Sequence, residues 1–266
     1  MYYSPQQQQQ AYQQPAPAGP RVSPGVLFGV SLWRLVIIAS AFIGFGAAMS
    51  KSKSGSALTA LSQQGSLLVG VVYVGLLLYP LFVAGRRHEP RSPWWRGAMV
   101  ILMLLVSITF MAIMNGSLGQ TWSLFEHLIT PLLVLVDFLA VGRNQVAVKW
   151  WHPITWTAFP LAYLIYYVSA GLRLYGSFLN PKKSSFAGTV TGFIVAVLVV
   201  GYLLFLFGIL KASATGQRPP KAPPGYPQQQ YYQQPYPQQY QQPPQQQLYA
   251  PPPNQPPPPP GYPPTG

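Results

Sequence analysis

The chain has 266 residues, of which 49% are hydrophobic and only 7% are charged. A soluble domain carries roughly 25% charged residues, so this composition indicates a membrane protein and argues against an ordinary soluble enzyme. Cysteine is absent, which excludes disulfides and thiolate chemistry, and with three histidines and three acidic residues we expect neither a metal site nor another cofactor.

The formal net charge of +13 does not by itself indicate a nucleic-acid partner. The basic residues cluster in the short segments between apolar stretches, where the orientation of a membrane protein already explains them. We therefore expect membrane lipid, and no nucleic acid, as the partner of the apolar region.

The two ends of the chain are rich in Gln, Pro and Tyr. Residues 1–25 and 211–266 cannot bury enough apolar surface to offset their chain entropy, so we expect both to be disordered. The proline run near the C-terminus favours polyproline II, a conformation that aromatic grooves recognise. The tails are therefore either docking sites for protein partners or solvated extensions.

Six apolar segments between the tails are each long enough to cross a hydrocarbon core of ~30 Å as a helix. They predict an all-α fold, a polytopic bundle of six transmembrane helices within residues 26–210. The first segment is too long for the core of a signal peptide, and the fifth is interrupted by Pro160, which a bundle tolerates. The predicted spans are residues 26–49, 66–85, 97–116, 121–142, 153–172 and 187–210.

With six spans both tails lie on one side of the membrane, and the basic residues identify that side. The side of the tails carries Arg21, Arg86, Arg87, Arg91, Arg96, Arg143, Lys149, Lys211, Arg218 and Lys221, and the other side carries Lys51, Lys53, Arg173, Lys182 and Lys183. The positive-inside rule therefore predicts a cell-membrane protein with both termini in the cytoplasm.

The fourth span contains Glu126, His127 and Asp137, although the whole chain has only three acidic residues and three histidines. Ionisable side chains inside a membrane are costly and commonly functional. Asp137 falls in the inner half of the membrane, and so does Arg34 of the first span. We predict a structural ion pair between Arg34 and Asp137, because an unpaired charge at that depth would be costly.

A second polar group is predicted in the outer half. His127 lies there, and the chain entering the second span carries Thr59, Ser62, Gln63 and Gln64. A hydroxyl beside a neutral imidazole is the minimal arrangement for acyl transfer. The same residue types also serve as interhelical hydrogen-bond partners in membrane bundles, and the spacing alone does not choose between these interpretations.

Four motifs within residues 26–210 resemble one family of membrane proteins. They are Leu61-Ser62-Gln63-Gln64-Gly65-Ser66-Leu67-Leu68, the spacing His127, Pro131 and Asp137, the spacing Trp156, Pro160 and Tyr163, and the loop Tyr175-Gly176-Ser177-Phe178-Leu179-Asn180-Pro181. The chain thus resembles actinobacterial six-helix membrane proteins with proline-rich tails. These are distantly similar to the androgen-induced and androgen-dependent-TFPI-regulating membrane hydrolases.

In those hydrolases a threonine at the start of the second helix and a histidine in the fourth cleave fatty acid esters of hydroxy fatty acids. By position, the resemblance implies His127 as the catalytic histidine and Ser62, in place of the threonine, as the nucleophile, with Thr59 as a fallback. Gln63, Gln64 or a backbone N–H would stabilise the oxyanion. The implied function is an intramembrane lipid-ester hydrolase acting near the outer leaflet.

The alternative is a non-catalytic membrane scaffold whose proline-rich tails recruit protein partners. A transporter fits less well, because the first, third and sixth spans carry little polar lining beyond Arg34.

Overall fold

The computed structural model describes residues 22–52, 56–176 and 178–216, and every element in these ranges is helical. The tails predicted at residues 1–25 and 211–266 lie outside the described residues except at their inner edges, where they continue the first and last helices. The prediction that they are disordered and recruit partners falls on that undescribed part.

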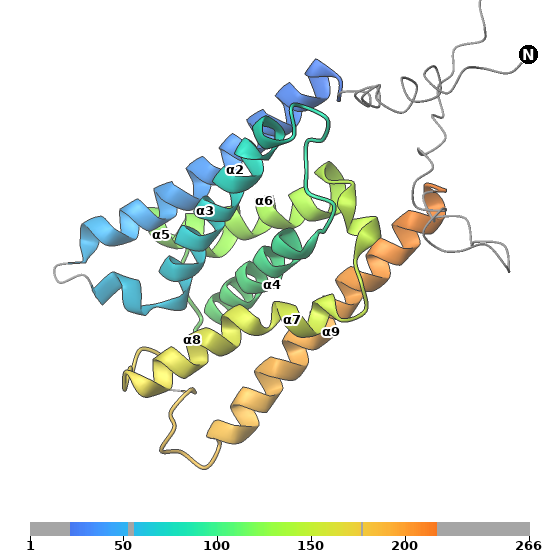
Figure 1. The fold of residues 1–266 in the computed structure, drawn as a ribbon. Coiled ribbons are helices and arrows are strands. Elements are labelled where there is room, and N and C mark those ends of the chain that lie inside the picture. Colours follow the sequence, from blue (N-terminus) through green and yellow to red (C-terminus); the bar gives the residue numbers. More distant parts are fainter. Residues whose placement is uncertain (1–21, 53–55, 177, 217–266) are drawn as a thin grey trace, which may run out of the picture. The chain divides into compact units, whose positions relative to one another are not determined.

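Five helices in the described part are long and apolar enough to cross a membrane, judged by length and composition. This is the architecture of an integral membrane protein (Figure 1). The five are α2 (Pro24–Lys51), α3 (Leu61–Phe82), α4 (Trp94–Ile108) with the π-helical η2 (Thr109–Ile113), the composite helix Thr121–Val141, and α9 (Phe186–Ala214).

The composite helix corresponds to the predicted fourth span and alternates between α and π geometry. Its segments are α5 (Thr121–Leu124), η3 (Phe125–Ile129), α6 (Thr130–Val136) and η4 (Asp137–Val141), of which η3 and η4 are π-helical. π-Turns are rare and occur frequently at functional sites, and η3 is the segment that carries Glu126 and His127.

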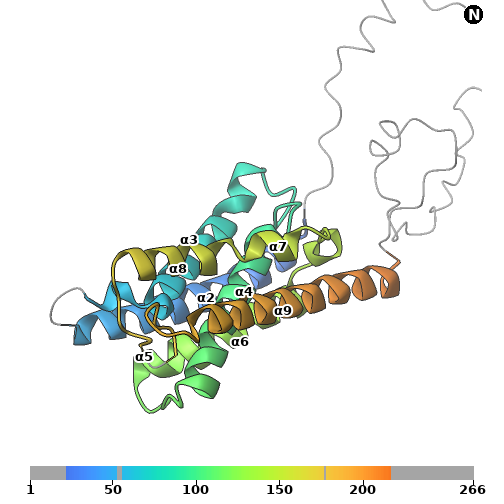
Figure 2. The ribbon, with the colours of Figure 1, turned by 90° about the horizontal axis from the view of Figure 1, so that it is seen from below.

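The predicted fifth span is two shorter helices, α7 (His152–Trp156) and α8 (Ala158–Ser169), separated at Thr157. Neither is long enough to count among the five, so the sixth crossing stays a prediction. Figure 1 shows the two helices following one another along α4, and α7 packs against both α4 and α9. Figure 2 views the same packing from below. Two short 3₁₀ turns, η1 (Ser56–Thr59) and η5 (Asn144–Ala147), complete the described elements.

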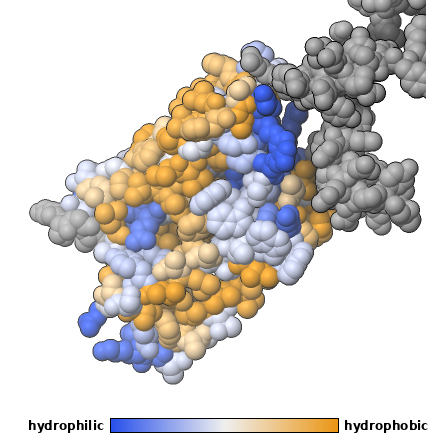
Figure 3. Space-filling model, viewed as in Figure 1, coloured by the Kyte–Doolittle hydropathy of each residue, from blue (hydrophilic) through white to orange (hydrophobic). Residues whose placement is uncertain are grey.

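The outer surface of the helices is strongly apolar. Leu81 and Phe82 are 75% and 83% exposed, and Phe28 and Ile165 are exposed to a similar degree. Figure 3 shows hydrophobic residues over much of the visible face, with hydrophilic residues confined to separate patches. Such a surface suits contact with lipid tails rather than water.

Helix α3 begins earlier in the chain than the predicted second span, which was expected to start at residue 66. The helix instead starts at Leu61, so Ser62 and Gln63 lie in its first turn rather than in a loop. It ends after Phe82, where Ala84 and Gly85 adopt positive φ angles of 51° and 71°. Residues in this left-handed conformation terminate helices.

A buried polar network closes the end of the bundle opposite the start of α3. The carboxylate of Asp137 accepts a hydrogen bond from Arg96 Nε at 2.7 Å and another from the Tyr73 hydroxyl at 2.9 Å. Arg96 also contacts Glu89, at 3.2 Å, and the side chain of Asn144. The network therefore joins α3, α4, the end of the composite helix and the segment before α4.

The predicted ion pair between Arg34 and Asp137 was wrong in its choice of arginine. Arg34 donates instead to the carbonyl oxygens of Leu76 and His88, each at 2.6 Å, and Asp137 pairs with Arg96. The prediction placed Arg96 in a cytoplasmic loop, whereas α4 already begins at Trp94 and turns Arg96 into the bundle. Both arginines are buried. The expected depth of the charges in the membrane therefore did not distinguish Arg34 from Arg96 as the partner of Asp137.

Glycine at position 142 is required by this network. A Cβ atom there would collide with the guanidinium group of Arg96, which passes directly over the backbone of Gly142. The composite helix therefore ends where its backbone makes room for the arginine that neutralises Asp137.

We expect Arg96 and Asp137 to be energetically coupled. Arg96→Ala and Asp137→Ala should each destabilise the protein by about 3–5 kcal/mol, because each leaves the other charge buried and unpaired. The double variant should be more stable than the sum of the two losses predicts. Unfolding of the purified protein in detergent measures this, with Arg34→Ala and Asp137→Ala as the comparison pair. Stronger coupling of Asp137 to Arg34 than to Arg96 would contradict the assignment.

Candidate functional site

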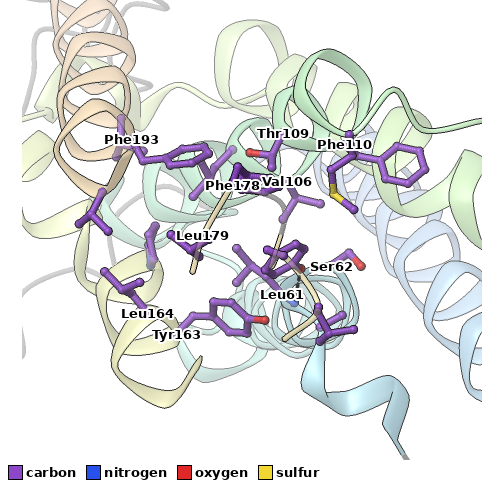
Figure 4. A pocket seen from close by; sticks show the side chains of 18 of the residues that line it. Leu61, Ser62, Val106, Thr109, Phe110, Tyr163, Leu164, Phe178, Leu179 and Phe193 are labelled. Carbon is purple, nitrogen blue, oxygen red and sulfur yellow. Dashed lines mark hydrogen bonds between the residues drawn. The ribbon is translucent and has the colours of Figure 1, made fainter. Parts of the chain in front are cut away.

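An apolar cavity of about 290 Å³ lies at the end of the bundle where α3 begins. Figure 4 shows Leu61 and Ser62 of α3 on its wall, with Tyr163 of α8, Phe178 after α8 and Phe193 of α9 around them. Most of the lining side chains are aliphatic or aromatic, and the few polar groups come from α3, η2, η3, the tyrosines and Thr157 between α7 and α8. A cavity of this kind suits a hydrocarbon chain with one polar group.

Two tyrosines from other elements fix the start of α3. The hydroxyl of Tyr163 donates to the carbonyl oxygen of Thr59 at 2.8 Å, and the Leu61 N–H donates to the hydroxyl of Tyr175 at 3.2 Å. Burial raises the pKa of the Tyr175 phenol, so it stays neutral at physiological pH. Both tyrosines belong to motifs seen in the sequence, but no pattern there indicated that they anchor the turn that carries Ser62.

Ser62 lies on the cavity wall and is largely buried. Its neighbour Gln63 also reaches the wall, but its side-chain Nε2 donates to Glu126 Oε2 at 3.0 Å. Gln64 is not on the wall, because its Nε2 bonds the carbonyl of Leu58 at 2.7 Å on the exposed side of the helix. The Gln64 amide is thus directed away from the place where an oxyanion would form.

His127 faces the same cavity from η3. Its Nδ1 lies 3.1 Å from the carbonyl oxygen of Ser123, and because a carbonyl only accepts, Nδ1 carries the proton of the neutral ring. The ring stacks on Phe110 with a centroid separation of 3.7 Å, and Trp122 packs edge-on against it. The imidazole is therefore held in one orientation with Nε2 as the basic nitrogen.

Pro131 explains how this part of the helix is connected to α4. Proline has no N–H, so the carbonyl of His127, four residues earlier, lacks its usual helical partner. The hydroxyl of Ser107 on α4 donates to that carbonyl at 2.6 Å. A backbone group freed by proline is thus satisfied by a neighbouring helix, as the interior of a membrane requires.

Ser62 and His127 both line this cavity, and no direct hydrogen bond joins them, so the predicted dyad stays a prediction. Thr59, the fallback nucleophile, is not among the lining residues, although its backbone carbonyl bonds Tyr163. Within the described residues, no group of three or more His, Cys, Asp or Glu side chains is close enough to hold a metal ion. The chemistry open to the cavity is that of a hydroxyl, an imidazole and a buried carboxyl group.

Comparison of the chain with protein-family models, with curated proteins and with solved structures finds no match. The functional argument therefore depends on the residues of the cavity.

We expect the cavity to bind a long acyl chain. Val197 is buried and lines the cavity, whereas Val195 lies on the exposed side of the same helix. Val197→Trp should fill the space and weaken binding of palmitate about tenfold or more, while Val195→Trp should leave the affinity unchanged. Titration of detergent-purified protein, followed by tryptophan fluorescence or calorimetry, gives both values. Equal affinities in the two variants would place the acyl chain elsewhere.

Proposed function

We propose that the protein is an intramembrane hydrolase of long-chain lipid esters. Ser62 is the nucleophile that attacks the ester carbonyl, and His127 is a general base of the reaction. The observation that carries the proposal is that a hydroxyl and an imidazole with a free Nε2 open into the same apolar cavity. The resemblance of the motifs to known membrane hydrolases points in the same direction.

The start of α3 supplies the remaining requirement of acyl transfer, which is a group that stabilises the oxyanion. Ser62 and Gln63 lie in the first turn of a 22-residue helix, where backbone N–H groups have no helical acceptor. The partial positive charge at a helix N-terminus favours an anion there. In this proposal the backbone N–H groups of the first turn bind the oxyanion, and neither glutamine side chain is needed for it.

The apolar lining defines the substrate class. Phe178, Leu179 and Phe193 line the cavity and offer no partner for a charged or sugar-like group. A linear acyl chain fills such a space, with its ester placed between Ser62 and His127. Water-soluble short esters bury less apolar area and should be poorer substrates.

Ester turnover by the detergent-purified full chain tests the proposal. Ser62→Ala and His127→Ala should each lower the turnover of a long-chain ester by about 100-fold or more, the usual contribution of a nucleophile or a general base. Thr59→Val should remain active, which distinguishes the two candidate nucleophiles. Ser40→Ala and His88→Gln serve as matched controls, because both side chains lie outside the cavity.

Loss of activity with Thr59→Val and not with Ser62→Ala would move the nucleophile to Thr59. Full activity of both Ser62→Ala and His127→Ala would reject the hydrolase proposal.

We further propose that α7 and α8 together form a sixth crossing, which places both tails in the cytoplasm and the cavity near the outer leaflet of the cell membrane. The pair spans residues 152–169 with a single break at Thr157 and packs along α4 and α9. The excess of basic residues on the side of the tails supports this orientation.

Single cysteines report the orientation directly, because the natural chain contains none. Ser117→Cys should react with a membrane-impermeant maleimide in intact cells, while Ser4→Cys and Thr265→Cys should react only after lysis. Labelling of one terminus alone in intact cells would show that α7 and α8 do not cross. If both terminal cysteines were labelled in intact cells and Ser117→Cys were not, the protein would have the opposite orientation, with both tails outside the cell.

A further inference from the structure

Glu126 is a second ionisable group behind the cavity, and the reaction described so far does not use it. It precedes His127 in η3 and is 0% exposed. The backbone of α2 approaches it closely at Gly44, where a Cβ atom would lie 2.9 Å from Glu126 Cγ. The carboxyl group is therefore enclosed by α2, α3 and its own helix.

The described residues offer the carboxyl group of Glu126 polar partners but no cation. Its Oε2 accepts from Gln63 Nε2 at 3.0 Å, and the hydroxyl of Ser62 also interacts with it. Its Oε1 is buried and makes no hydrogen bond of ordinary geometry, and none of the ion pairs among the described residues includes Glu126. A buried carboxylate without a cation is costly, and ionisable groups kept within a membrane are commonly functional.

Ser62 and His127, by contrast, are not joined directly. The Nδ1 of His127 bonds the carbonyl of Ser123, and no hydrogen bond joins the imidazole to Ser62, although both side chains line the cavity. Hydrolysis through an acyl-enzyme needs a base twice, first for the attacking hydroxyl and then for the attacking water. The cavity offers one base in contact with the hydroxyl and another that faces the open space.

We propose that Glu126 is the catalytic residue that takes the proton of Ser62 in the first step, and that His127 activates the water in the second. The inference rests on the proposed ester hydrolysis and assigns the base of each of its two steps to a different residue.

The steps balance as follows. The Ser62 O–H bond breaks as Oγ bonds the ester carbon, and the proton passes to the carboxylate of Glu126. The carbon–oxygen bond to the alcohol then breaks, and the alcohol oxygen takes that proton back from Glu126. In the second step water loses a proton to His127 Nε2 and bonds the acyl carbon. The bond to Ser62 breaks, and the proton of the imidazolium returns to Oγ through a water molecule.

Rapid mixing of the full chain in detergent with p-nitrophenyl palmitate separates the two steps. His127→Asn should release about one nitrophenol per protein in a burst and then turn over slowly, with a palmitoyl group left on Ser62. Glu126→Gln should show no burst and a first turnover slowed by about 100-fold or more. Glu126→Asp, which keeps a carboxyl group, should recover part of the burst.

A purely structural role for Glu126 would give a different result, because glutamine keeps its size and can still accept from Gln63. A full burst in Glu126→Gln would therefore overturn the inference. The inference would also be overturned if His127→Asn lost the burst and Glu126→Gln kept it, because His127 would then be the base in both steps. Loss of turnover in Ser62→Ala would in that case still support the proposed hydrolase. Full turnover in both Ser62→Ala and His127→Ala would reject the proposed function itself. Thermal unfolding of each variant checks that the fold is retained.

Discussion

The ion pair between Asp137 and Arg96 is the interaction on which one end of the bundle depends. A membrane offers no water to a buried charge, so every partner of Asp137 must come from the protein. Tyr73 and Arg96 supply them from α3 and α4, and Glu89 and Asn144 satisfy the remaining donors of the arginine. Four separate segments therefore meet at one charge, which fixes their register at that end.

The other end of the bundle is organised differently. There the helix containing His127 is loosened by a π-turn and by Pro131, and its free carbonyl is taken up by Ser107. The space that opens is lined by apolar side chains and holds the hydroxyl of Ser62 at its edge. One end of the bundle is thus closed by an ion pair, and the other end keeps a cavity lined by Ser62 and His127.

The sequence predicted the helical class, because apolar segments long enough to span a membrane indicate helices. The catalytic pairing of Ser62 with His127 stays a prediction. The sequence did not predict which arginine pairs with Asp137, since that depends on where α4 begins and on the missing side chain at Gly142. The start of α3 was also placed too late, because Ser62 and Gln63 looked like loop residues in an apolar context. Tyrosine contacts from distant segments hold that turn in helical form, and no local pattern encodes them.

All three acidic side chains of the chain are buried: Glu89 and Asp137 in the network, and Glu126 behind the cavity. Of the 16 basic residues, Arg34 and Arg96 are enclosed with them, so the surface carries cationic side chains and no acidic ones. The exposed basic residues therefore have no acidic side chain of the same protein on the surface to pair with. Anionic phospholipids are the natural source of counter-charge, at about 1 kcal/mol for each basic residue near the headgroups. A bilayer depleted of acidic lipid would therefore offer fewer favourable contacts to the basic surface of this protein.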